Sequence, residues 1–72
     1  MASCLVAPLA GTVWKVEVKQ GEAIAQGTVC VVLESMKMEI PLEAPTTTVV
    51  AQVLCAEGDV VQEGDPLVHF VS

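Results

Sequence analysis

The amine of Lys37 is the group in this sequence best placed for covalent chemistry. It lies between Met36 and Met38, and acidic residues precede and follow this triplet at Glu34 and Glu39. No flanking residue is suited to activating the amine, so a separate enzyme would have to do so. The pattern favours a passive acceptor of an attached group over a nucleophilic catalyst. Taken alone, Lys37 would equally suit a solubilising surface charge.

The other reactive side chains are too few and too scattered to form a catalytic or metal site. His69 is the only histidine, and no triad or acid–base pair can be argued around it. Cys4, Cys30 and Cys55 make an odd number without C-x-x-C spacing. We therefore expect no zinc site, and three free thiols in a reducing compartment. We also expect no catalytic residue.

The charge balance excludes several classes of partner. The sequence has nine acidic residues, three lysines and no arginine, which gives a formal net charge of −6. Nucleic acids and anionic membranes are bound by clustered cations, and this chain has no such cluster. The sequence shows no signal-peptide pattern and no apolar stretch long enough to span a membrane. Protein partners with basic docking faces are expected instead.

The elements that must hold Lys37 occur twice in the chain. A shift of 37 positions aligns the two halves without gaps, so that Ala7-Pro8 meets Ala44-Pro45. Such a repeat predicts two similar units that share one core. The predicted single domain, residues 1–72, has units at about 5–35 and 42–72, joined by a hairpin at 36–41.

Both units are predicted to be β-structure. Trp14, Val16 and Val18 alternate with polar residues, the period of a half-buried strand. Trp14 is expected to be a core residue or a partly covered anchor, and Lys15 and Lys19 are expected on the outer face of the strand. No segment shows a sustained helical period. We predict an all-β flattened barrel or sandwich of two four-stranded sheets, a barrel-sandwich hybrid with internal quasi-twofold symmetry. The joining hairpin is exposed at one end and carries Lys37 at its tip.

The run Glu34-Ser35-Met36-Lys37-Met38-Glu39 resembles the biotin attachment signature of the biotinyl/lipoyl domain family, Glu-Ala/Ser-Met-Lys-Met. The resemblance covers almost the whole chain, including Ala7-Pro8 and Gly11. It implies that a biotin protein ligase joins biotin to Lys37 by an amide bond. It also implies that the ligase recognises Met36 and Met38, with at most a minor role for Glu34. One departure is Thr48, where the first unit has Gly11, and a changed turn is expected there.

The same resemblance implies a biotin carboxyl carrier. Biotin on Lys37 would take a carboxyl group at a biotin carboxylase and deliver it at a carboxyltransferase, so the chain itself is expected to be no enzyme. The run from Val13 to Gly27 leaves no room for the inserted thumb of some bacterial carriers. We expect a monomeric domain in the cytoplasm, or in the mitochondrial matrix if the parent enzyme is eukaryotic.

Two other functions are open at this stage. A lipoyl domain of a 2-oxo acid dehydrogenase complex has the same fold and acceptor position, but usually has Asp before the lysine and Ala after it. Met36 and Met38 argue against lipoate, while a protein that accepts both cofactors stays open. An unmodified interaction module is the other alternative, and the intact motif around Lys37 argues against it.

Overall fold

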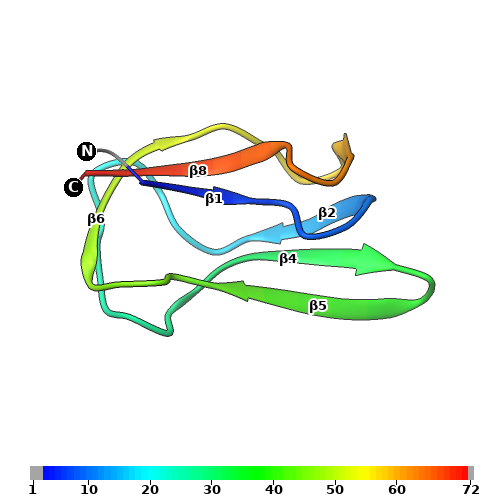
Figure 1. The fold of residues 1–72 in the computed structure, drawn as a ribbon, viewed down its shortest axis with the longest axis horizontal. Coiled ribbons are helices and arrows are strands. Elements are labelled where there is room, and N and C mark those ends of the chain that lie inside the picture. Colours follow the sequence, from blue (N-terminus) through cyan, green and yellow to red (C-terminus); the bar gives the residue numbers. More distant parts are fainter. Residues whose placement is uncertain (1–2, 72) are drawn as a thin grey trace.

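Eight strands make two antiparallel sheets in the computed structural model, which describes residues 3–71. One sheet has the order β1-β8-β6-β3 and the other β5-β4-β2-β7 (Figure 1). The predicted all-β sandwich of two four-stranded sheets is confirmed. Within residues 3–71 no helix is long and apolar enough to cross a membrane. The strands are β1 Ser3–Val6, β2 Gly11–Val16, β3 Ala23–Ile24, β4 Val29–Ser35, β5 Met38–Glu43, β6 Thr48–Val53, β7 Val60–Val61 and β8 Pro66–Val71.

The hydrogen bonds of the turns repeat with the sequence. The N–H of Gly21 donates to the carbonyl of Val50 at 2.7 Å, and the N–H of Gly58 donates to that of Val13 at 2.8 Å. Both glycines have positive φ, 87° and 96°, which a side chain would strain. Since each donor and acceptor is offset by 37 positions from its counterpart, the predicted quasi-twofold symmetry is confirmed.

A β-bulge overturns the predicted alternation around Trp14. The register between β2 and β4 shifts between Val13 and Lys15, so that β2 carries one extra residue there. Val13 is buried, whereas Trp14 keeps 45% of its surface exposed. Of the two expected possibilities for Trp14, a core residue or a partly covered anchor, the structure has the partly covered one. Strand β2 also ends at Val16, which leaves Lys19 in the following loop rather than on the strand.

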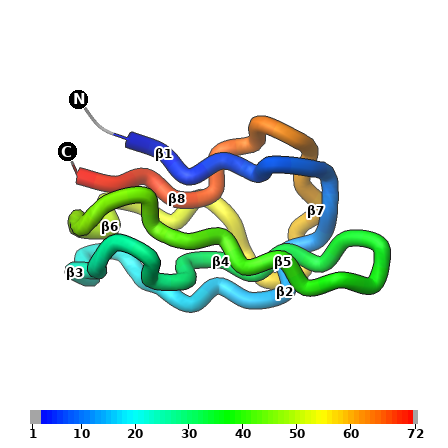
Figure 2. Tube along the Cα trace, turned by 60° about the horizontal axis from the view of Figure 1, so that its bottom comes forward, coloured from blue at the N-terminus to red at the C-terminus, as the bar shows by residue number. Residues whose placement is uncertain are grey.

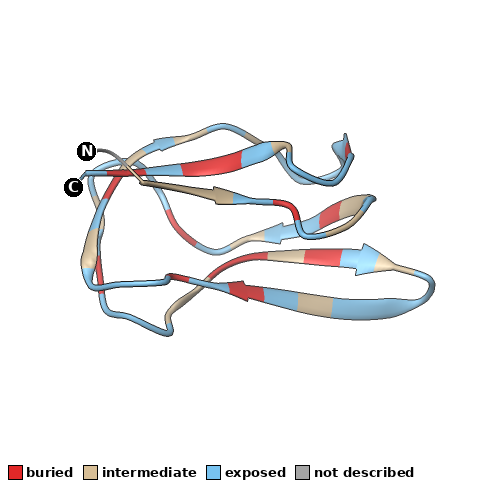
Figure 3. Ribbon diagram, viewed as in Figure 1, coloured by how far each residue is buried: buried red, intermediate tan, exposed pale blue. Residues whose placement is uncertain are grey.

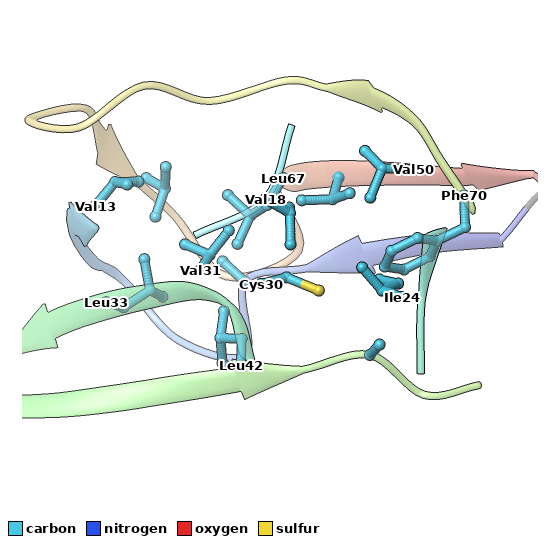
Figure 4. Packing of buried hydrophobic residues seen from close by; sticks show 14 residues of the cluster. Val13, Val18, Ile24, Cys30, Val31, Leu33, Leu42, Val50, Leu67 and Phe70 are labelled. Atoms are coloured by element: carbon cyan, nitrogen blue, oxygen red, sulfur yellow. The ribbon is translucent and has the colours of Figure 1, made fainter. Parts of the chain in front are cut away.

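The core lies between the sheets and is built almost entirely from aliphatic side chains around Phe70 (Figure 4). Leu33 on β4 and Leu42 on β5 belong to it, and they hold the base of the β4–β5 hairpin. Beyond them the hairpin is largely exposed and forms one end of the molecule (Figure 3). The buried residues are Ala7, Val13, Val18, Ile24, Cys30, Val31, Leu33, Leu42, Ala44, Val50, Val61, Leu67, Val68 and Phe70.

The long axis of the molecule separates the β4–β5 turn from the outer ends of β1 and β8. The molecule measures 32 × 18 × 17 Å, and β1 and β8 pair at the end opposite the β4–β5 turn (Figures 1 and 2). Residues 38–41, expected to belong to the joining hairpin, lie in β5, whose counterpart in the repeat is β1. The two-residue turn at Met36 and Lys37 is what joins the units.

The three cysteines are free thiols, with Cys30 buried and Cys4 and Cys55 partly buried. Burial, and to a lesser degree the charge of Glu22, raises the pKa of Cys30. Burial, followed by the charge of Asp59, raises the pKa of Cys55. Because the thiolate is the reactive form, both thiols should be poor nucleophiles near neutral pH.

Thiol titration should therefore distinguish the folded from the unfolded chain. Denatured protein prepared without reductant should give three reactive thiols per chain. In the folded protein Cys30 and Cys55 should react more slowly than in the denatured protein, and their rates should rise as pH is raised toward their elevated pKa values. A single reactive thiol with a mapped internal disulfide would contradict this account.

Candidate functional site

The β4–β5 hairpin closes in the shortest way that an antiparallel pair allows. Ser35 pairs with Met38, so only Met36 and Lys37 form the turn. The hairpin extends past the end of β2 and is the outermost part of this end of the molecule (Figure 2). The sandwich thus holds Lys37 at its tip on a pair of strands fixed by the core.

The turn residues are unfavourable for the backbone they adopt. φ is 52° at Met36 and 65° at Lys37, and two-residue hairpins of this kind normally use Asn-Gly. A residue with a side chain costs about 1–2 kcal/mol in this region. Since Gly would be less strained, the side chains at the tip serve something other than the stability of the turn.

The side chains around Lys37 are exposed. Met36 keeps 88% of its surface exposed and Met38 59%, and Lys37 between them is exposed as well. Solvated methionines are adaptable contact groups for a partner. The structure therefore brings Met36, Lys37 and Met38 together at the tip, as the sequence predicted, and their roles stay predictions.

Two carboxylates lie one step in from the turn. Glu34 on β4 is directly opposite Glu39 on β5, and both are exposed. Like charges facing each other across a strand pair are destabilising. The pair therefore gives the tip a local negative charge at some expense of stability.

The hairpin lies close against Gly11 near its tip, at a position that the sequence marked only through the family resemblance. A Cβ at this position would lie 2.8 Å from the carbonyl oxygen of Glu34, closer than real Cβ atoms approach. At the equivalent position Thr48 donates its hydroxyl to the carbonyl of Val71, the counterpart of Glu34. The changed turn expected at Thr48 was wrong, because Thr48 lies within β6. In the sequence, the replacement of Gly11 by Thr48 at the equivalent position of the repeat was the feature that could have indicated the close contact between Gly11 and Glu34.

The rest of the described chain offers no second centre of this kind. Over residues 3–71 no pocket is found, and no three His, Cys, Asp or Glu side chains lie close enough to hold a metal ion. His69 is exposed on β8, in the sheet that does not carry the hairpin. The β4–β5 tip is the place where the predicted site residues meet.

Comparison with known proteins agrees with this geometry. The family model described as "Biotin-requiring enzyme", of the biotin/lipoyl group, matches residues 3–70. The chain belongs to the biotinyl/lipoyl domain family. This match runs through both halves of the biotinyl/lipoyl domain and includes the whole β4–β5 hairpin.

Relatives of this biotinyl/lipoyl domain are small proteins or parts of large enzymes. The Biotin/lipoyl attachment protein of Bacillus subtilis is 50% identical over 62 residues, covering 86% of this chain and 85% of that protein. The mitochondrial propionyl-CoA carboxylase alpha chain of Homo sapiens is 45% identical over 69 residues, covering 96% of this chain but 10% of that one. A single-chain, multi-domain long-chain acyl-CoA carboxylase has a segment of the same fold, with a TM-score of 0.91 and 43% identity over 96% of this chain and 7% of the other. The chain is thus homologous to a small segment of each carboxylase.

Proposed function

We propose that this biotinyl/lipoyl domain is a biotin carboxyl carrier with biotin joined to Nζ of Lys37. The observation that carries the proposal is the tip itself: Lys37 lies in a strained two-residue turn between two exposed methionines. A carboxylase chain among the relatives and one among the similar structures support the carboxyl-carrying role. The chain acts as a carrier and as a substrate of the ligase, and not as an enzyme.

The tip suits attachment because a modifying enzyme has to enclose the amine. An exposed turn at the end of a rigid sandwich can enter a cleft without unfolding any strand. In the attachment step the Nζ of Lys37 forms a bond to the carboxyl carbon of biotin, which ATP has activated. The bond from that carbon to its nucleotide leaving group breaks, and the amine loses its proton to the ligase or solvent. When bound, biotin would supply the nitrogen that holds the transferred carboxyl group.

The contribution of the domain to carboxyl transfer is position. Tethering keeps the cofactor near a biotin carboxylase and a carboxyltransferase, which raises its effective concentration at both. The outer ends of β1 and β8 lie at the end of the molecule opposite the Lys37 tip, so a connection made there would leave the tip free to enter either enzyme (Figure 1). We propose a monomeric domain in the cytoplasm or mitochondrial matrix, and the three free thiols support a reducing compartment.

Lipoate is the second candidate cofactor, and the name of the Bacillus subtilis relative supports it as a candidate. That name includes both biotin and lipoyl attachment, which fits a domain accepting either group. Met36 and Met38 favour biotin in this chain, since lipoyl domains usually have Asp before the acceptor lysine and Ala after it. The distinction therefore depends on the two residues that flank Lys37.

Intact mass measured after incubation with biotin, ATP and a biotin protein ligase tests both candidates. We expect one added biotin per chain. Met36→Asp with Met38→Ala should slow biotinylation at least about tenfold, because a loss of roughly 1.4 kcal/mol over the two positions together is already a tenfold effect. The exposed positions of these methionines mean that the variant should stay folded. Unchanged biotinylation of the variant, or faster lipoylation than biotinylation of the wild type under a lipoate ligase, would contradict the assignment.

A further inference from the structure

The outer face of the β5-β4-β2-β7 sheet presents a continuous surface that begins one residue from the turn. Its first row crosses all four strands, since Glu39 pairs with Glu34, Glu34 with Thr12, and Thr12 with Val60. Val60 at the end of this row keeps 74% of its surface exposed. The surface therefore starts acidic beside the Lys37 tip and becomes apolar away from it.

The second row of this surface is apolar around Trp14. Pro41 pairs with Val32, and Val32 pairs with Lys15 beside the bulge that exposes Trp14. The ammonium of Lys15 lies 5.7 Å from the centroid of the Trp14 ring, a cation–π contact on one part of the ring. The largest side chain of the protein is thus left 45% exposed on a sheet face rather than buried. We name the surface formed by these two rows the sheet platform.

The other half of the repeat shows that the fold does not require these side chains. The row equivalent to Glu34, Thr12 and Val60 is Val71, Val49 and Ala23, joined by the same strand pairings. The residue equivalent to Trp14 is Ala51, beside an equivalent bulge in β6. The same backbone therefore forms without a tryptophan and without carboxylates. Their presence on one face only points to a role outside folding.

The length of a lysine side chain indicates which partner must touch this surface. Only four methylenes separate the Lys37 amine from the backbone of the tip. An enzyme that acts on the amine itself must place the rim of its active site in contact with the β4–β5 turn and the adjacent sheet. An enzyme that acts on the far end of an attached biotin can stay further away. The platform is thus within reach of the ligase in particular.

We propose that the sheet platform is the docking surface for the biotin protein ligase, an inference that rests on the proposed attachment at Lys37. Trp14 and Val60 supply the apolar anchors, since exposed aromatic side chains dominate the energy of many interfaces. Glu34 and Glu39 face cationic side chains of the ligase, which relieve the repulsion between them. The docking partner therefore presents an apolar patch with a basic rim.

Steady-state biotinylation of the whole chain by a purified biotin protein ligase tests the platform. We expect Trp14→Ala to raise the KM for the carrier about tenfold while kcat stays within twofold, because docking and not chemistry is weakened. Glu39→Gln should raise KM by a smaller factor and reduce its dependence on salt. Trp14→Phe should retain most of the wild-type affinity.

The repeat supplies the matched control, Val49→Ala on the equivalent row of the other sheet, which should leave KM unchanged. Val60→Asp changes the second anchor at a largely exposed site, and it should also raise the KM for the carrier. This variant serves as the test if circular dichroism shows that Trp14→Ala is unfolded. Unchanged KM in folded Trp14→Ala or Val60→Asp would overturn the docking proposal, as would a defect seen only in carboxyl transfer. Absence of any labelling of the wild type would instead overturn the proposed function.

Discussion

Lys37→Arg should abolish biotinylation while leaving the domain folded. Arginine keeps the positive charge and the exposed position, but its guanidinium stays charged and does not offer an amine for acylation. The tip makes no core contact, so the change should alter the free energy of unfolding by no more than about 0.5 kcal/mol. Intact mass after incubation with biotin, ATP and ligase gives the extent of labelling, and thermal denaturation gives the stability.

The matched control uses the other two lysines of the chain. Lys15 lies on β2 and Lys19 in the loop after it, and both are exposed. A Lys15→Arg, Lys19→Arg variant retains Lys37 alone and should still take up one biotin per chain. If Lys37→Arg is labelled as fast as the wild type, exposure alone would explain acceptor choice and the proposed site would be wrong.

Phe70→Ala should produce the largest loss of stability. Phe70 is fully buried on β8 and packs between the sheets (Figure 4). Truncation of a buried Phe costs about 3–5 kcal/mol. Since small domains lie near the lower end of a total stability of about 5–15 kcal/mol, the variant should retain no more than about 2 kcal/mol and be partly unfolded at 37 °C. Urea denaturation followed by circular dichroism measures the change.

Val71→Ala is the neighbouring control on the same strand. Val71 is exposed, and its truncation should change the free energy of unfolding by no more than about 0.5 kcal/mol. A loss below about 1 kcal/mol in Phe70→Ala would mean that the core does not depend on this ring. The folded fraction of Phe70→Ala should also limit the rate at which the ligase labels it.

The sequence predicted those parts of the molecule that follow from its repeat. An offset of 37 positions is enough to infer two equivalent sheets, and a motif that falls on the join places Lys37 at a hairpin tip. The burial of both Leu33 and its counterpart Phe70 follows the same logic. These features depend on spacing along the chain, which the sequence contains.

Features that depend on register between distant strands could not be predicted. Alternation left Trp14 either in the core or partly covered, and only the pairing of β2 with β4 reveals the bulge that turns it outward. The direct opposition of Glu34 and Glu39 requires the register of β4 with β5. A glycine at position 11 suits a turn as well as a close contact, and the carbonyl of Glu34 is what decides between them.

The pairing of β1 with β8 has a mechanical consequence. The two strands are antiparallel, with Ser3 opposite Phe70, and their outer ends emerge side by side (Figure 1). Tension applied at these two adjacent ends would break the hydrogen bonds between β1 and β8 one after another, and not all at once. The ladder between β4 and β5 lies at the far end of the long axis. Tension applied at these two strand ends would therefore open the β1–β8 pair first, at the end of the molecule away from Lys37.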